Sequence, residues 1–224
     1  MHLVEPELAG LASIVYPGDQ VIDVGAAHGM YTYPLARLVG RSGRVVAFEP
    51  QPRQRRALEV FSNFFRLHQV KVDDAALGAR GGESILVLPK FLRVPIYGHA
   101  HLEATHPRKS GPWGYRAVSV RTIDSFCDQQ GLEDLAFIKV DVEGFELDVV
   151  KGAQTMIERC RPSMLIEIED RHTARYGHTG AEVVAHILNT WPEYRLYRWA
   201  KDAWIATDAV HPATRNYLFT VKVV

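Results

Sequence analysis

Residues 21–32 read VIDVGAAHGMYT, and the fold prediction starts from this segment. Its apolar start predicts a short buried strand, and Gly25 and Gly29 predict a tight turn into a helix. The pattern is DxGxxxG, which differs from the dinucleotide fingerprint GxGxxG because Ala27 takes the place of the central glycine. The Asp23 carboxylate before the turn would repel a pyrophosphate and attract a cation. The turn therefore favours a ligand that carries positive charge.

Around this stretch, short β-branched runs alternate with longer segments of helical periodicity. This alternation is typical of parallel strands joined by crossover helices, so we predict an α/β fold. The predicted strands are residues 21–24, 44–48, 70–72, 84–88, 117–120, 136–140, 164–168, 194–199 and 217–223, the last two joined as a hairpin. The predicted helices are residues 7–15, 33–38, 53–68, a segment capped by Thr122, 146–159 and 181–189. In residues 53–68, apolar residues recur at helical spacing with arginines elsewhere, which predicts an amphipathic helix.

The composition bounds the class of protein. A length of 224 residues with 47% hydrophobic residues predicts one domain over residues 1–224. Basic and acidic residues number 26 each, and this zero net charge argues against nucleic acid as a partner. Cys127 and Cys160 are too few for a disulfide framework and predict reduced thiols. Because no 18-residue apolar run and no secretory signal at residues 1–10 occur, we expect a cytoplasmic protein without membrane contact.

Ligands of open parallel sheets bind at the carboxyl ends of the strands, where this chain carries carboxylates and glycines. Glu49 follows the second strand, 24 positions after Gly25, where it would accept hydrogen bonds from a ribose diol. Asp73 and Asp74 follow the third strand, where an adenine contact and the capping of a turn are the alternatives. The candidate cofactor-binding residues are Asp23, Gly25, Ala26, Gly29, Glu49, Asp74, Ala75 and Asp141.

Four motifs, VIDVGAAHGMYT, VVAFEPQP, IKVDVEGFELDVVKGA and MLIEIE, together resemble the FkbM-type S-adenosylmethionine-dependent methyltransferases. The resemblance covers about residues 21–169 and departs from the family at Ala27-His28, where a small polar residue such as asparagine is more usual. It implies a Rossmann-like sheet of seven mostly parallel strands, with an antiparallel last strand and helices on both faces. It also implies S-adenosylmethionine as cofactor and methyl transfer to a hydroxyl oxygen of a small molecule, such as a natural product, sugar or glycan. The ammonium and sulfonium of that cofactor suit the Asp23 carboxylate.

Methyl transfer to an alcohol calls for a base or a Lewis-acid metal beside the oxygen, because an alcohol is a weak nucleophile at neutral pH. The ends of the strands at 136–140 and 164–168 carry a dense acidic cluster. The candidate catalytic residues are Asp141, Glu143 and His172. We prefer His172 as the base, since a neutral imidazole accepts a proton near pH 7. For Asp141 and Glu143 the alternative is capping of the following helix.

A metal site is one alternative for the acidic cluster. Asp141, Glu169 and Asp170 resemble the acidic trio of cation-dependent O-methyltransferases, and such oxygen ligands suit Mg²⁺. Hydrogen bonding is the other alternative, because Glu167 and Glu169 share one face of a strand by period two.

Residues 89–116 show no periodicity and are rich in proline, glycine, histidine and aromatic residues, which predicts a long loop that selects the acceptor. Its pocket-wall candidates are Tyr97, His99, His101, Trp113 and Tyr115, with zinc held by His99, His101 and His106 as the alternative. The domain would then divide into a cofactor half at about 1–88, this loop, and a catalytic half at about 117–224.

Two other functions stay open. A nicotinamide-dependent oxidoreductase would also use Glu49 for a ribose, although the missing central glycine speaks against it. A non-catalytic adenosyl-binding protein would keep the fold without the reaction. The sequence leaves the oligomeric state open, with a homodimer as one alternative, and does not identify the hydroxyl acceptor.

Overall fold

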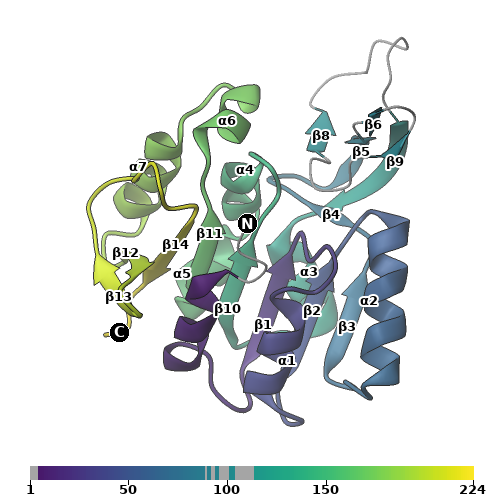
Figure 1. Ribbon diagram of the computed structural model, residues 1–224, viewed down its shortest axis with the longest axis horizontal. Helices are drawn as coiled ribbons and strands as arrows, with labels where there is room; N and C mark the ends of the chain where they lie inside the picture. The colour runs from purple at the N-terminus through teal and green to yellow at the C-terminus, as the bar shows by residue number, and fades with distance from the viewer. Residues whose placement is uncertain (1–4, 89, 92–93, 96–100, 104–113) are drawn as a thin grey trace.

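The computed structural model describes residues 5–88, 90–91, 94–95, 101–103 and 114–224, and its centre is one large sheet (Figure 1). The sheet has eight strands in the order β13-β12-β14-β11-β10-β1-β2-β3. Their bounds are β1 (Gln20–Val24), β2 (Arg44–Phe48), β3 (Val70–Asp73), β10 (Leu135–Val140), β11 (Ser163–Glu167), β12 (Arg195–Ala200), β13 (Ala203–Ala206) and β14 (Asn216–Thr220). The neighbouring strands β3, β2, β1, β10 and β11 are parallel, and β14 is antiparallel to β11 and β12. The predicted α/β fold and antiparallel last strand are confirmed, with β13 as an additional edge strand.

Helices cover both faces of this sheet, as expected (Figure 1). One face packs against the 3-10 helix η1 (Pro6–Ser13), α1 (Thr32–Val39) and α2 (Pro52–Phe64). The other packs against α3 (Ile123–Gln130), α4 (Glu146–Lys151), α5 (Gln154–Cys160) and α7 (Gly180–Thr190). Two short helices, α6 (Asp170–Thr173) and η3 (Ala174–Tyr176), follow β11. Because strand side chains alternate, Val21 packs with Leu35 on one face and Ile22 packs with Phe126 on the other.

A second sheet corrects the expectation of an irregular loop at 89–116. It has the order β4-β9-β5-β8, with β4 (Ala76–Leu77), β5 (Gly82–Leu88), β8 (His101–Glu103) and β9 (Gly114–Arg121). β5 and β9 pair antiparallel along their length, so β9 begins before the predicted strand at 117. A separate short pair joins β6 (Lys90–Phe91) to β7 (Val94–Pro95). Of the pocket-wall and zinc candidates, Tyr97, His99, His106 and Trp113 lie outside the described residues.

Two predicted helices differ from the structure, and in both, side chains form hydrogen bonds with the main chain. The segment at 7–15 is a 3-10 helix, and the Gly10 carbonyl accepts hydrogen bonds from Ser13 Oγ at 2.8 Å and Trp204 Nε1 at 3.1 Å. The predicted helix at 146–159 is two helices, α4 and α5. The Asp124 carboxylate starts α5 by accepting hydrogen bonds from the main-chain N–H groups of Thr155 and Met156, both at 2.9 Å.

The predicted terminal hairpin also contains one strand more than expected. β12 pairs with β14, as predicted, but β12 also pairs with β13 across a turn at Lys201 and Asp202. Both turn residues have positive φ, 53° and 57°, in a turn that favours asparagine or glycine. Of the two turn residues, Asp202 is of a type that such turns accept, whereas Lys201 gives no turn signal.

The helix α2 buries less of its apolar side than its periodicity predicts. Leu58 is fully buried, whereas Phe61, Phe64 and Phe65 are 50%, 76% and 60% exposed. Their rings pack on one another instead, Phe61 stacked on Phe65 and Phe64 edge-on to Phe65.

Across the described residues, no helix is long and apolar enough to cross a membrane.

Candidate active site

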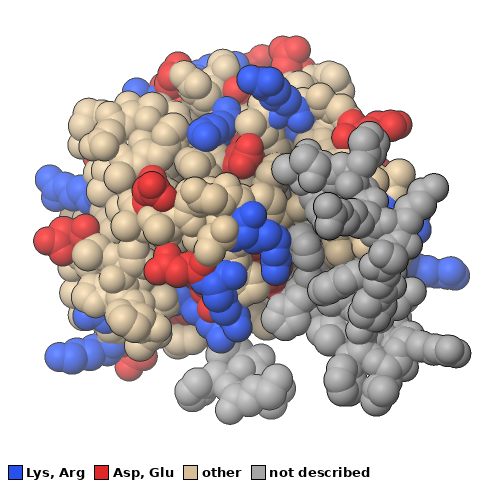
Figure 2. Space-filling model, turned by 90° about the horizontal axis from the view of Figure 1, so that it is seen from above, with Lys and Arg blue, Asp and Glu red and all other residues tan. Residues whose placement is uncertain are grey.

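A cavity of about 350 Å³ lies at the carboxyl ends of the central strands, where the parallel sheet predicts a ligand site. Its lining comes from the ends of β1, β2, β10 and β11, from the second sheet, and from the segment before η1. Figure 2 looks onto this side of the molecule and shows acidic and basic side chains next to one another on it. The two halves of the sequence thus meet at one cavity.

Gly25 allows the β1 and β10 loops to meet at the floor of this cavity. Its φ is +79°, and a β-carbon there would lie 1.8 Å from the main-chain oxygen of Asp141. Any larger residue would push the two loops apart. The glycine therefore serves the close approach of two main chains, as well as a sharp turn.

Glu49 connects the ends of β1 and β2. Its Oε2 accepts a hydrogen bond from Ala27 N at 2.8 Å, and its Oε1 accepts one from Gln51 N at 2.7 Å. Burial raises the pKa of this carboxyl to about 7. Each carboxylate oxygen keeps a second lone pair, so the group is able to accept further hydrogen bonds from a ligand diol. Glu49 lines the cavity, where the sequence placed it.

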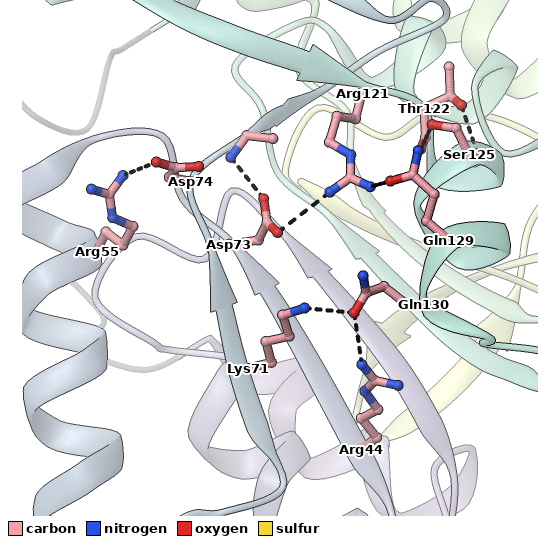
Figure 3. Close-up of polar contacts among 11 residues, drawn as sticks. Arg44, Arg55, Lys71, Asp73, Asp74, Arg121, Thr122, Ser125, Gln129 and Gln130 are labelled. Atoms are coloured by element: carbon pink, nitrogen blue, oxygen red, sulfur yellow. Dashed lines mark hydrogen bonds and ion pairs between the residues drawn. The ribbon is translucent and has the colours of Figure 1, made fainter.

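Asp74 does not line the cavity, so the structure does not place this predicted adenine contact at the site. Its side chain is 70% exposed and forms an ion pair with Arg55 at 3.3 Å (Figure 3). Asp73 accepts a hydrogen bond from Ala75 N at 3.0 Å and pairs with Arg121 (Figure 3). The capping alternative therefore describes Asp73, and Ala75 itself does line the cavity.

Three further cofactor-binding candidates, Asp23, Ala26 and Gly29, support the cavity from behind its lining. Asp23 is buried and accepts a hydrogen bond from Thr32 Oγ1 at 2.6 Å, which ties β1 to the start of α1. Burial raises the pKa of Asp23 to about 6. Gly29 has φ +89°, and a β-carbon there would lie 2.4 Å from the Tyr33 ring. These residues shape the turn rather than contact the space within it.

Asp141, Glu143, Glu167 and Glu169 all line the cavity, so the acidic cluster predicted from the strand ends is present. Burial, followed by repulsion from the Asp141 carboxylate, raises the pKa of Glu143 to about 8. The same two causes raise the pKa of Glu167 to about 10. Both shifts favour the protonated, uncharged form of these carboxyls, first through burial and then through the neighbouring negative charge.

His172, the residue preferred as the base from the sequence, does not line the cavity. It is 6% exposed, and its Nδ1 contacts Oε2 of Glu143. The reason is the turn at Glu143-Gly144, where Glu143 has φ +57° and a β-carbon on Gly144 would lie 2.3 Å from the His172 main-chain oxygen. The chain of His172 thus passes directly behind this turn, and Glu143 separates the imidazole from the cavity.

The trio proposed for magnesium is not assembled. Asp141 and Glu169 line the cavity, but Asp170 accepts a hydrogen bond from Gly180 N at 2.7 Å and holds the start of α7. Glu169 pairs with Arg171 at 2.8 Å and with Arg215 at 3.4 Å. Among the residues that the structure describes, no group of three metal-ligating side chains comes together.

The structure adds lining residues that the sequence reasoning missed. Leu86 and Leu102 enter from the second sheet, and Arg171 and Arg215 enter through their pairs with Glu169. Glu5 enters from the segment before η1. No motif surrounds Glu5, and for Leu86 the sequence predicts a strand at 84–88 without a place at the site.

The cavity can therefore accept a cationic nucleoside. Its described lining contains six carboxylates and two arginines, and apolar side chains such as Phe48 and Phe145 cover its remaining walls. Burial is the first cause of the raised carboxyl pKa values, and a ligand that brings positive charge would offset the second, the repulsion between carboxylates. The donor set fits the ammonium and sulfonium of S-adenosylmethionine.

Comparisons with known proteins agree with this geometry. A model of the methyltransferase FkbM domain matches residues 23–198. The crystal structure of a methyltransferase FkbM from Methylobacillus flagellatus KT has a TM-score of 0.58 and 19% identity, and the match covers 96% of this chain and 50% of that one. This chain thus spans about half the length of that protein. A sequence comparison with curated proteins finds no match.

Two further solved structures share the fold. A S-adenosylmethionine-dependent O-methyltransferase from Thermotoga maritima has a TM-score of 0.52 and 15% identity, over 100% of this chain and 68% of that one. Fibrillarin from Aeropyrum pernix, with natively bound S-adenosyl-L-methionine, has a TM-score of 0.51 and 16% identity. This match covers 96% of this chain and 73% of that one. At these identities the structures establish the architecture, and the domain match over most of the sequence establishes the family. The chain belongs to the FkbM methyltransferase domain family.

Proposed function

We propose that this protein binds S-adenosylmethionine and transfers its methyl group to a hydroxyl oxygen of a small molecule. The observation that carries the proposal is the excess of carboxylates over arginines in the lining of a cavity at the switch point of the sheet. Carboxyl groups with raised pKa values are poised to accept a cation, since a nearby positive charge favours their ionised form. Family membership points to the same cofactor.

The β1 and β2 ends would hold the nucleoside half. Glu49 would accept hydrogen bonds from the ribose hydroxyls, while its bonds to Ala27 and Gln51 keep it fixed. Phe48 and Ala75 supply an apolar wall for the adenine. When bound, the cofactor supplies an activated methyl group, so the protein needs to orient an oxygen and accept its proton.

Glu143 is the group best placed to accept that proton. It lines the cavity, its pKa of about 8 makes it a stronger base than an ordinary carboxylate, and His172 contacts its Oε2 from behind. Its left-handed backbone, φ +57°, is the kind of strained conformation that structures keep at functional sites. His172 would then be a positioning residue that fixes the Glu143 carboxylate.

The acceptor would approach from the second sheet. Leu86, Leu102 and Phe145 form an apolar wall on this side of the cavity. Tyr176 braces that wall, because its hydroxyl donates to the Leu102 main-chain oxygen at 2.7 Å and its ring packs on Phe145. We expect a hydroxyl on a partly apolar body rather than on a fully polar one.

Thermal unfolding with S-adenosylhomocysteine, with NADH and with neither ligand tests the cofactor. A ligand that binds the native state raises the melting temperature, so we expect a rise with S-adenosylhomocysteine alone. A rise with NADH alone would overturn the proposal. A product screen over candidate alcohols, detected by a mass gain of one methylene, then identifies the acceptor, and methylation found solely on nitrogen would overturn the O-methyl assignment.

A further inference from the structure

Glu5 brings a carboxylate into the cavity from a part of the chain that no motif connects to the site. It lies directly before η1, and it lines the cavity together with residues at the ends of β10 and β11. Its main chain has φ −74° and ψ 128°, an extended conformation directly before the helix begins. Glu5 therefore takes part in the lining of the site.

Two donors from different elements fix the Glu5 carboxylate through one of its oxygens. Oε2 accepts a hydrogen bond from Asn216 Nδ2 at 3.0 Å and another from the Tyr31 hydroxyl. Within the described part of the chain, Oε1 accepts no hydrogen bond. A carboxylate held in this way presents one oxygen to a ligand without losing its orientation.

Lys139 contacts both of these donors, Asn216 and Tyr31. It is fully buried, its Nζ donates to Asn216 Oδ1 at 2.9 Å and to the Val140 main-chain oxygen at 3.1 Å, and it lies 4.8 Å from the centre of the Tyr31 ring. Asn216 has only one orientation that satisfies both Lys139 and Glu5, since its oxygen faces one and its amide nitrogen faces the other. The buried cation thus sets the geometry of a carboxylate at the cavity.

The sheet order places Glu5 at the end of the cavity away from the ribose position. Asn216 belongs to β14, and Glu49 follows β2, with β11, β10 and β1 between those strands. A nucleoside whose ribose lies at Glu49 would direct its other end across β1 and β10, towards Asp141 and Glu5. That end of the cofactor carries the α-ammonium group.

We propose that Glu5 is a binding residue for the α-ammonium of the methionine part of the cofactor, held in place by Tyr31, Asn216 and Lys139. This inference rests on the proposed function. It requires that removal of the Glu5 charge weakens the binding of only those ligands that contain the amino acid part of the cofactor. A loss that arises from misfolding would weaken all adenosyl ligands alike.

Isothermal titration calorimetry of the full chain with two ligands whose sulfur is an uncharged thioether tests this inference. S-adenosylhomocysteine contains the amino acid part, whereas 5′-methylthioadenosine lacks it. We expect Glu5→Gln to weaken S-adenosylhomocysteine binding by about tenfold to a hundredfold, as for a lost hydrogen bond to a charged group, and to leave 5′-methylthioadenosine binding within about twofold. Asn216→Ala should give the same selective loss at smaller size, because Glu5 would lose one of its two donors.

Glu7→Gln is the matched control. Glu7 Oε1 also lies 3.1 Å from the Tyr31 hydroxyl, whose single hydrogen is directed to the closer Glu5, but Glu7 does not line the cavity, so both affinities should stay unchanged. Equal weakening of both ligands by Glu5→Gln, or no weakening of either, would overturn the inference while the proposed function stands. If the unaltered protein binds neither ligand, the proposed function itself fails.

Discussion

A β-carbon on Gly25 would lie 1.8 Å from the main-chain carbonyl oxygen of Asp141, a distance that no packing rearrangement of side chains relieves. Gly25→Ala should therefore abolish cofactor binding and lower the melting temperature strongly. Gly177→Ala is the matched control, because Gly177 shares the φ of +79° but has open space around it. We expect this control to cost roughly 1 kcal/mol of unfolding free energy, from backbone strain alone, and to keep binding. Equal effects of the two substitutions in thermal unfolding would contradict the steric argument.

Glu49 should be required for cofactor affinity, and Asp74 should not. Glu49→Gln removes the charge and exchanges one acceptor for a donor opposite the N–H groups of Ala27 and Gln51. We expect S-adenosylhomocysteine affinity to fall by at least about tenfold, as measured by titration calorimetry. Asp74→Asn should leave it unchanged, since that side chain faces solvent and Arg55. A larger loss from the Asp74 variant would restore the adenine assignment.

Activity should depend on the ionisation of Glu143. A base acts in its unprotonated form, and the pKa of this carboxyl is raised to about 8, so kcat/KM should rise with pH up to about that value. Glu143→Gln should lower kcat by about 10²-fold to 10⁴-fold and remove this limb of the profile. Glu158→Gln, on the exposed side of α5, serves as the control. A Glu143→Gln enzyme that keeps both its rate and its pH profile would exclude the base.

The ligand-free protein should be more stable in mild acid than in mild base. The folded-state pKa values of Asp23, Glu49 and Glu143 are raised to about 6, 7 and 8, so the folded state binds more protons than the unfolded chain between pH 4 and these values. Stability is therefore fully present below the unfolded pKa values and is lost as pH rises through the folded ones. We expect the melting temperature at pH 8.5 to lie at least about 5 °C below that at pH 5.5. A melting temperature that rises over this interval would refute the pKa directions.

The sequence predicts those parts of the site that follow from local pattern and strand order. Gly25, Glu49, Asp141 and Glu143 each follow a strand of the parallel sheet, and strand ends meet at one edge, so their convergence is a geometric necessity. The sequence does not predict that the His172 side chain lies behind Glu143, because its distance from Glu169 along the chain says nothing about which way the chain turns. The turn depends on Gly144, whose main chain packs against that of His172.

The remaining differences arise from tertiary contacts that have no local signal. Asp124 divides the helix predicted at 146–159 by accepting main-chain hydrogen bonds from α5, across more than thirty positions of sequence. Glu5 reaches the cavity because Asn216, at the opposite end of the chain, donates to it. The helical periodicity in residues 53–68 predicts the helix α2. It does not predict that Phe61 and Phe64 stay exposed, with no element covering them among the described residues.

The crowding of carboxyl groups in the cavity also affects the heat that is measured when the cofactor binds. Glu143 and Glu167 hold protons near neutral pH in the ligand-free protein, and an incoming cation would displace them into the buffer. The measured heat of association would then vary with the ionisation enthalpy of the buffer used. Affinity for the cofactor would increase as the solution becomes more alkaline, so the protein would be loaded most fully under the same conditions in which its empty form is least stable.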